Sequence, residues 1–256
     1  MNDPFEHHDV GHLSASSINE YIQNPARWLL HVSGFRDRAG VPAMWRGTAV
    51  DKAITAALLE GLSDDEALAM ANKSFADEQE EALRANQPVS VKKSEAEGEA
   101  VERYLRIALP HYRSLGTPLD SQKKIKMEFD FMSIPIIGYL DLKYEGIVRD
   151  IKTVSRLPSV VPTTVSRQLA IYATAEQSLP LVDYVHSTKK SAQVVVMGVP
   201  DVEGHMRTVE RAAMGMQRLL GLSKDIKEIA RFVMPNFDDW RWSESEKIAA
   251  KELWNL

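Results

Sequence analysis

The hydrophobic pattern in the second half of the chain predicts β-strands. Residues 136–143 and 147–152 are rich in apolar and β-branched residues. Glu145 and Gly146 lie between them, which predicts a hairpin with a tight turn. Polar and apolar residues alternate over 124–131, as in a half-buried strand antiparallel to the next one. Two further strands are predicted at residues 181–188 and 192–199. We therefore expect this half of the chain to build a sheet.

Helical periodicity and capping signals dominate the first half. Ser14 is a candidate N-cap of a helix that Asn24 and Pro25 interrupt. Ser63 and Glu66 have the spacing of a capping box. The segments that we expect to be helical are residues 14–23, 26–30, 44–60, 63–85, 92–115, a helix capped by Thr163 or Thr164, 201–232, and a last helix ending at Leu253 and Trp254.

Length and composition indicate an ordinary globular protein. The chain has 256 residues, of which 44% are hydrophobic and 26% charged, and no repeat or linker divides it. We therefore predict one domain over residues 1–256, with a helical insertion at about residues 63–116. No apolar run could span a bilayer, and residues 1–6 lack the start of a secretory signal. The absence of cysteine excludes disulfides and thiolate metal sites, which fits a cytoplasmic protein without a membrane partner.

The net charge of −5 does not favour binding to nucleic acid by overall electrostatics. If the partner is DNA, basic residues must be concentrated locally. The candidates are two lysine-rich runs, residues 123–126 and Lys189 with Lys190. The alternative is that both runs are solvated surface.

Candidate chemistry gathers on the predicted hairpin. Side chains alternate along a strand, so Asp150 and Lys152 share one face, and Asp141 on the partner strand can meet them. Two carboxylates and an ammonium are costly to bury unless they bind something. A divalent cation would remove that cost. The alternative is a solvated hairpin with an ordinary ion pair.

The order of these residues resembles the PD-(D/E)XK nuclease superfamily, in its RecB-type and lambda-exonuclease-like branch. The pattern is an Asp ending one strand, an Asp-x-Lys on the next, and a Gln-x-x-x-Tyr on the following helix. Here these are Asp141, Asp150 with Lys152, and Gln168 with Tyr172. The resemblance implies an α/β fold with a three-layer, restriction-endonuclease-like core, in which helices flank a central mixed sheet. It also implies catalytic roles for these five residues.

The resemblance further implies a site for Mg²⁺ or Mn²⁺. Asp141, Asp150 and the carbonyl of Ile151 would hold the ion. Asp51 stands where the family has a helical histidine, and an aspartate oxygen suits these ions better than imidazole does. Glu128 is a secondary candidate ligand, predicted on the strand beside Asp141. The alternatives are surface ion pairs, of Asp51 with Lys52 or Arg46, and of Glu128 with a lysine.

A second group of residues is expected to contact DNA. The serine-rich helix start resembles the opening of RecB-type nucleases, where such segments border the DNA path. Ser14 and Ser16 offer hydroxyls near a helix N-terminus, and Arg27 can assist in binding phosphate. Arg156 lies in the loop after Lys152 and would border the catalytic face. The alternative for the first helix is a capped amphipathic helix without a ligand.

The function that we predict from the sequence is a metal-dependent deoxyribonuclease. The resemblance favours a DNA exonuclease of the phage-recombination kind, acting in the cytoplasm of a bacterium or phage-infected cell. It also implies a single-strand-annealing partner and a ring-shaped homo-oligomer. The alternatives are an endonuclease of repair or restriction type, a catalytically silent nucleic-acid-binding module, and a regulatory protein-binding protein. Phosphate-loop, H-E-x-x-H and G-x-S-x-G motifs are absent from the sequence.

Overall fold

The centre of the molecule is a five-stranded mixed sheet. The computed structural model describes residues 3–35, 40–188 and 191–256. The strands lie side by side in chain order, with all neighbours antiparallel except β3 and β4. Helix α7 supplies the crossover that this parallel pair requires. The strands are β1 (Asp120–Met127), β2 (Ile136–Tyr144), β3 (Ile147–Val154), β4 (Leu179–Ser187) and β5 (Ala192–Gly198).

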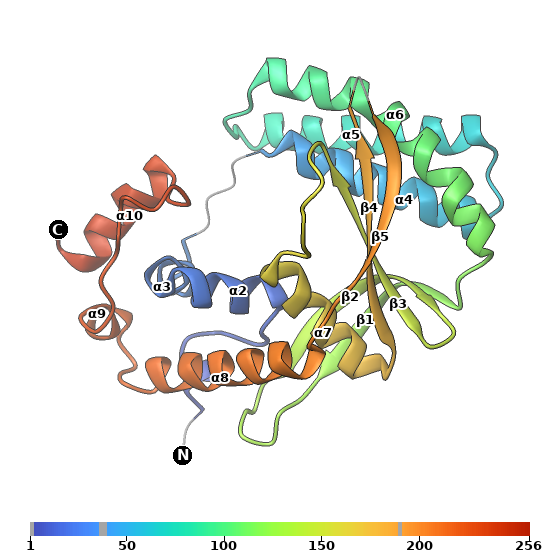
Figure 1. Cartoon of the computed structure of the whole chain (residues 1–256). Coiled ribbons are helices and arrows are strands. Elements are labelled where there is room, and N and C mark those ends of the chain that lie inside the picture. The colour runs from blue at the N-terminus through green and yellow to red at the C-terminus, as the bar shows by residue number, and fades with distance from the viewer. Residues whose placement is uncertain (1–2, 36–39, 189–190) are drawn as a thin grey trace.

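Helices cover both faces of this sheet, which confirms the three-layer α/β architecture (Figure 1). One face packs against α4 (Pro42–Leu59), α5 (Asp64–Arg84) and α6 (Val91–Leu115), whose apolar residues form one cluster with Leu142, Ile151 and Val185. The other face packs against α2 (Ala15–Gln23) and α7 (Thr163–Glu176), and α8 (Val202–Leu220) packs on these two helices. The remaining helices, α1 (Pro4–His7), α3 (Pro25–Val32), α9 (Ile226–Ala230) and α10 (Glu244–Trp254), extend this second layer.

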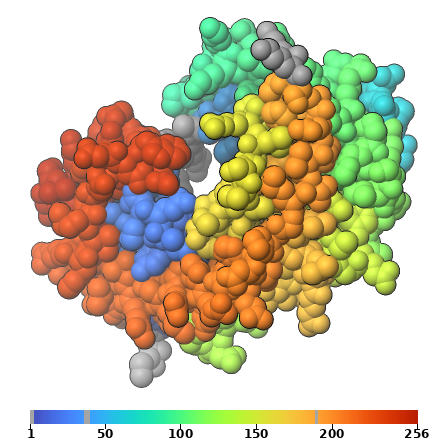
Figure 2. Space-filling view, in the orientation of Figure 1, coloured from blue at the N-terminus to red at the C-terminus, as the bar shows by residue number. Residues whose placement is uncertain are grey.

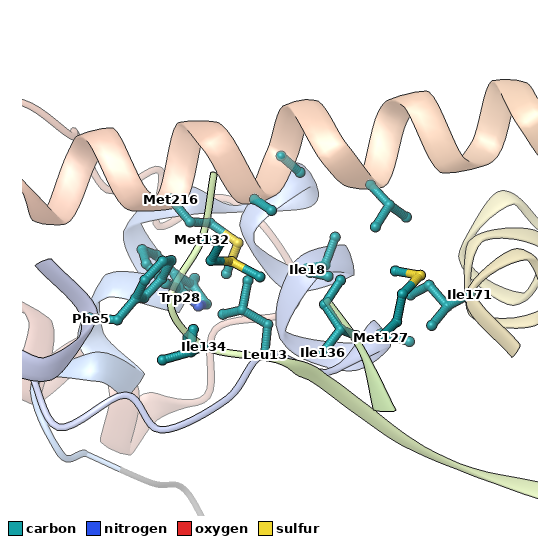
Figure 3. Packing of buried hydrophobic residues seen from close by; sticks show 14 of the residues in the cluster. Phe5, Leu13, Ile18, Trp28, Met127, Met132, Ile134, Ile136, Ile171 and Met216 are labelled. Carbon is teal, nitrogen blue, oxygen red and sulfur yellow. The ribbon is translucent and has the colours of Figure 1, made fainter. Parts of the chain in front are cut away.

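The larger hydrophobic cluster joins segments that are far apart in the sequence. Phe5, Leu13 and Trp28 from the N-terminal segment pack with Met132 and Met216 (Figure 3). Leu13 also forms a parallel bridge to Ile136 at the start of β2. The N-terminal helices are therefore fixed to the sheet that carries the candidate chemistry. Within the three described ranges, no helix has the length and apolar character needed to cross a membrane.

The predicted hairpin is confirmed, and its neighbouring strand is shifted. Gly146 has a φ of +67° in the turn between β2 and β3, a conformation that favours glycine. β1 ends at Met127, paired with Ile136, whereas the alternation predicted a strand to residue 131. Phe129 and Phe131 stack on each other beyond the strand and still pack on the core. Their burial in a loop explains why the pattern outlasts the strand.

Two helix boundaries differ from the prediction, whereas the predicted N-cap of α2, Ser14, is confirmed. The segment 201–232 is divided, because α8 ends at Leu220 and α9 begins only at Ile226. Neither Thr163 nor Thr164 caps α7, whose N-cap is Pro162 without a side-chain hydrogen bond. At α2, the capping box joins Ser14 to Ser17.

Gly138 lets α7 approach β2 closely. A Cβ atom at this position would lie 2.5 Å from Cε1 of Tyr172, whereas a Cβ at Gly198 on β5 would meet nothing closer than 4.0 Å. We expect Gly138→Ala to lower the free energy of unfolding by about 1–3 kcal/mol, because Tyr172 must move in a packed core. The matched change Gly198→Ala should stay within about 0.5 kcal/mol of wild type. Urea titration measures both, and equal effects would contradict the close approach.

Candidate active site

Asp141 lies where the β2–β3 hairpin separates. The last backbone pair before the separation joins Leu142 to Arg149. Beyond it, Oδ2 of Asp141 accepts a hydrogen bond of 2.7 Å from the backbone N–H of Ile151. The carboxylate thus replaces a carbonyl as the partner of β3. The regular backbone pairing of the two strands therefore ends at Leu142 and Arg149.

Both strands beside Asp141 are irregular. Leu140 packs in the cluster on the α7 side and Leu142 in the cluster under α4–α6, although residues two apart in a regular strand share a face. On β1, Gln122 has a φ of +49°, an uncommon conformation for a residue other than glycine. The regular alternation of side chains along β2 is therefore interrupted at Asp141, so that Leu140 and Leu142 face opposite sides of the sheet.

Buried Asp150 forms an ion pair with partly exposed Lys152 on the α7 side of β3. Asp150 is only 1% exposed, and Nζ of Lys152 lies 2.9 Å from its Oδ1 and 2.7 Å from its Oδ2. Gln168 donates from Nε2 to Oδ1 of Asp150 at 3.3 Å and to Oη of Tyr172 at 3.0 Å. Four of the five residues predicted to be catalytic are thus linked by direct contacts, and Asp141 joins them through Ile151.

Asp51 approaches the same place from the other helical layer. It lies on α4, where its Oδ2 accepts a hydrogen bond of 2.6 Å from Nε2 of Gln122. Its Oδ1 is enclosed and has no hydrogen-bond partner. The charges of Asp51 and Asp150 both act on Asp141, so the three carboxyl groups form one electrostatic cluster. Within the described residues, Asp51 forms an ion pair with neither Lys52 nor Arg46, so neither surface alternative is observed.

Burial and mutual repulsion raise the pKa values of the three carboxyl groups. Burial, helped by the charge of Asp150, raises the pKa of Asp51 to about 6. Burial and the charges of Asp150 and Asp51 raise the pKa of Asp141 well above its usual range. Burial also raises the pKa of Asp150, although Lys152 opposes this. For Lys152, burial acts to lower the pKa, but Asp150 and Asp141 outweigh it and bring the pKa to about 12.

The donor atoms in this cluster are those that suit a hard divalent cation. Oδ1 of Asp51 is enclosed without a hydrogen bond, and a cation would compensate such an oxygen, whereas Oδ2 of Asp150 already lies 2.7 Å from the ammonium of Lys152. Among the residues that the structure describes, no three acidic or histidine side chains already form a metal-ligand cluster. The chemistry of the cluster therefore fits Mg²⁺ or Mn²⁺, while Lys152 occupies Asp150 as its ion-pair partner.

The two remaining candidate ligands have different outcomes. Ile151 lies beside the carboxyl groups through its bond to Asp141, and the role of its carbonyl stays a prediction. The expectation that Glu128 adjoins Asp141 is wrong. Glu128 follows the end of β1, is exposed and pairs with Lys126 at 2.5 Å. The segment from Gln122, the neighbour of Asp141, to Glu128 spans roughly 20 Å of extended chain.

Three of the four residues expected to contact DNA line a cavity that none of the three carboxyl groups lines. Ser14, Ser16 and Arg27 line a cavity of about 850 Å³ beside α2 and α3. Ser14 accepts a hydrogen bond from Ser17 as the cap of α2, and Arg27 forms ion pairs with Glu20 and Glu246. Arg156 is exposed in the loop after β3. Their contacts with DNA stay predictions.

The lysine-rich runs do not form an unpaired basic patch where they are described. Lys123 pairs with Glu176 at 2.9 Å, and Lys126 pairs with Glu128. Lys189 and Lys190 lie outside the described residues.

Two residues that support the site have no signature in the sequence. Gln122 holds Asp51 from a left-handed position on β1. Arg46 is 5% exposed, pairs with Glu97 and donates to the carbonyl of Thr153 at 3.1 Å. Arg46 thereby holds α4 against β3, five residues before Asp51 in the chain. The one sequence feature that could have indicated a role for Arg46 is its position before Asp51 in the same predicted helix.

Comparison with known proteins identifies a family for the chain. A sequence model of the PD-(D/E)XK nuclease superfamily matches residues 12–244. The chain therefore belongs to the PD-(D/E)XK nuclease superfamily. A solved structure titled "Crystal structure of SSO0001" is 15% identical, with a TM-score of 0.32, and the match covers 73% of this chain and 84% of that one. No curated protein matched the chain.

We expect the metal-free protein to gain stability on mild acidification. The Asp51 carboxyl titrates near its ordinary value of 3.8 when unfolded and at about 6 when folded, so the native state binds more protons between these values. Stability then rises by roughly 1.3 kcal/mol from this group as the pH falls from about 7 to about 5, and the full gain of about 3 kcal/mol is reached only below the unfolded pKa.

Asp51→Asn removes this contribution. Urea unfolding in EDTA at both pH values measures the gain, which should be smaller in the variant than in wild type. An equal gain in the two proteins would contradict the burial of an ionised Asp51.

Proposed function

We propose that this member of the superfamily is a metal-dependent deoxyribonuclease that hydrolyses phosphodiester bonds. The observation that supports this most strongly is the convergence of Asp51, Asp141 and Asp150 beside the ammonium of Lys152. Such a cluster is electrostatically unfavourable in the metal-free protein, as the raised pKa values of its carboxyl groups indicate. A structural role alone gives no reason to gather three carboxyl groups here.

The ion that fits this cluster is Mg²⁺ or Mn²⁺, held by Asp51, Asp141 and Asp150. When bound, it supplies a positive charge for the reacting phosphate and acidifies a water molecule. Lys152 remains protonated at neutral pH, with a pKa of about 12, and places its charge where negative charge develops on the phosphate oxygens. Gln168 bonds Asp150 and Tyr172 together, which holds the carboxylate in position. The resemblance implies products with 5′-phosphate and 3′-hydroxyl ends.

We further propose that the enzyme attacks DNA ends. This preference rests on the resemblance to the lambda-exonuclease-like branch. The annealing partner and the ring-shaped oligomer are proposals on the same basis.

The preference for ends is tested with two substrates. We expect end-labelled linear duplex to be degraded with Mg²⁺ or Mn²⁺, and closed circular DNA to stay intact. Gel analysis of both in one reaction measures this, with EDTA as the control. Nicking of the circle would instead identify an endonuclease, and no digestion of either substrate with either ion would contradict the proposed function.

Removing either charge of the ion pair between Asp150 and Lys152 should strongly lower the rate of DNA digestion. We expect Asp150→Asn or Lys152→Met to lower the rate of digestion by roughly 10²–10⁴-fold, because each removes a group that acts on the reacting phosphate. Lys126→Met is the matched control, since it removes a lysine from an exposed pair with Glu128 and should leave the rate unchanged. Circular dichroism checks that all three variants fold. Wild-type rates in both site variants would contradict the assignment.

A further inference from the structure

The second buried arginine of the described chain has no acidic partner there. Arg167 on α7 is 8% exposed, and its Nε donates a hydrogen bond of 2.6 Å to Oδ1 of Asn19. No carboxylate in the described ranges forms an ion pair with it. Arg46, the other buried arginine, pairs with Glu97. A neutral amide is therefore the partner of one buried guanidinium, where a carboxylate holds the other.

Such an arrangement is unfavourable in the free protein. A guanidinium carries five N–H donors, and enclosing part of it without an acidic partner is unfavourable. Burial accordingly lowers the pKa of Arg167. Its terminal nitrogens are not among the fully enclosed side-chain atoms that lack a partner, so the tip of the side chain reaches solvent. The buried stem thus presents donors at the surface, which suits an anionic ligand.

Arg167 is next along α7 to a residue that contacts the carboxyl cluster, and it is bonded to a residue that lines the cavity beside α2. The next residue along α7, Gln168, contacts Asp150. On the other side, Asn19 holds the guanidinium, donates to the carbonyl of Thr164 at 3.0 Å and lines the cavity together with Ser16. In the space-filling view, α2 and α3 in blue lie at the edge of an opening between the C-terminal segment in red and the loop after β3 in yellow (Figure 2).

We propose that Arg167 binds a backbone phosphate of the nucleic-acid strand, next to the phosphate that reacts. This inference rests on the proposed function. A guanidinium matches the oxygens of a phosphate with two parallel hydrogen bonds, and Asn19 fixes its orientation. The chain has a net charge of −5, and the described lysines of its basic runs include two that are paired with glutamates. Arg167 therefore supplies local positive charge beside the acidic cluster.

Binding of a labelled oligonucleotide at several salt concentrations tests this proposal. Fluorescence anisotropy is measured with Ca²⁺ in place of Mg²⁺, and a gel confirms that the oligonucleotide stays intact. We expect Arg167→Met to weaken binding roughly tenfold at 0.1 M KCl. The slope of log K against log salt should become shallower by about 0.7–0.9, the contribution of one phosphate contact. Arg167→Lys should retain the slope and lose part of the affinity.

Arg106→Met is the matched control, because Arg106 is an exposed arginine of α6 paired with Glu102. It should change neither affinity nor slope. The melting temperature of Arg167→Met should not fall, since an apolar chain replaces an unpaired charge. Wild-type affinity and slope in Arg167→Met would overturn the proposal. If that variant does not fold, wild-type affinity in Arg167→Lys overturns it. A wild-type protein that binds no oligonucleotide would overturn the proposed function itself.

Discussion

The separation of β2 from β3 at Asp141 determines the rest of the site. Up to Leu142 the hairpin is held by backbone pairs, and beyond it the Asp141 carboxylate accepts from the N–H of Ile151. In a regular antiparallel ladder a backbone carbonyl would accept the hydrogen bond that Asp141 accepts here. Because the strands part, Asp51 can approach from α4 and Gln168 from α7. The acidic cluster thus depends on one side chain taking the place of a backbone carbonyl.

Repulsion within the cluster is balanced by contacts that lie outside it. Lys152 neutralises Asp150, Gln122 holds Asp51, and Arg46 fastens α4 to β3 through Thr153. Each contact anchors a different element, so the geometry does not rest on a single bond. The three carboxyl groups are unfavourable when ionised in the metal-free protein, as their raised pKa values indicate. Both apolar clusters and these anchors stabilise the fold enough to offset that cost. Functional sites commonly combine locally unfavourable groups with a rigid surrounding structure.

The sequence predicted the parts of the fold that depend on local pattern. The hairpin and the helical block follow from short-range spacing and are present in the structure, and the superfamily suggested by the order Asp141, Asp150, Lys152 and Gln168 is the one whose model matches the chain. Glu128 was misplaced because apolar alternation continues through Phe129 and Phe131 after β1 has ended. Gln122 and Arg167 could not be predicted, since their roles arise from a left-handed backbone position and from contacts between distant helices. Local patterns carry no information of that kind.

The site draws its residues from two layers that pack separately. Asp51 belongs to α4, whose apolar neighbours form the cluster on one face, and Gln168 belongs to α7 on the other face. A small slide of one layer relative to the sheet would alter the spacing of the reacting groups and expose almost no apolar surface. Interactions that depend on direction and distance weaken over such a shift, whereas burial does not. Heating is therefore expected to lower the activity of the site at temperatures where the fold is still intact.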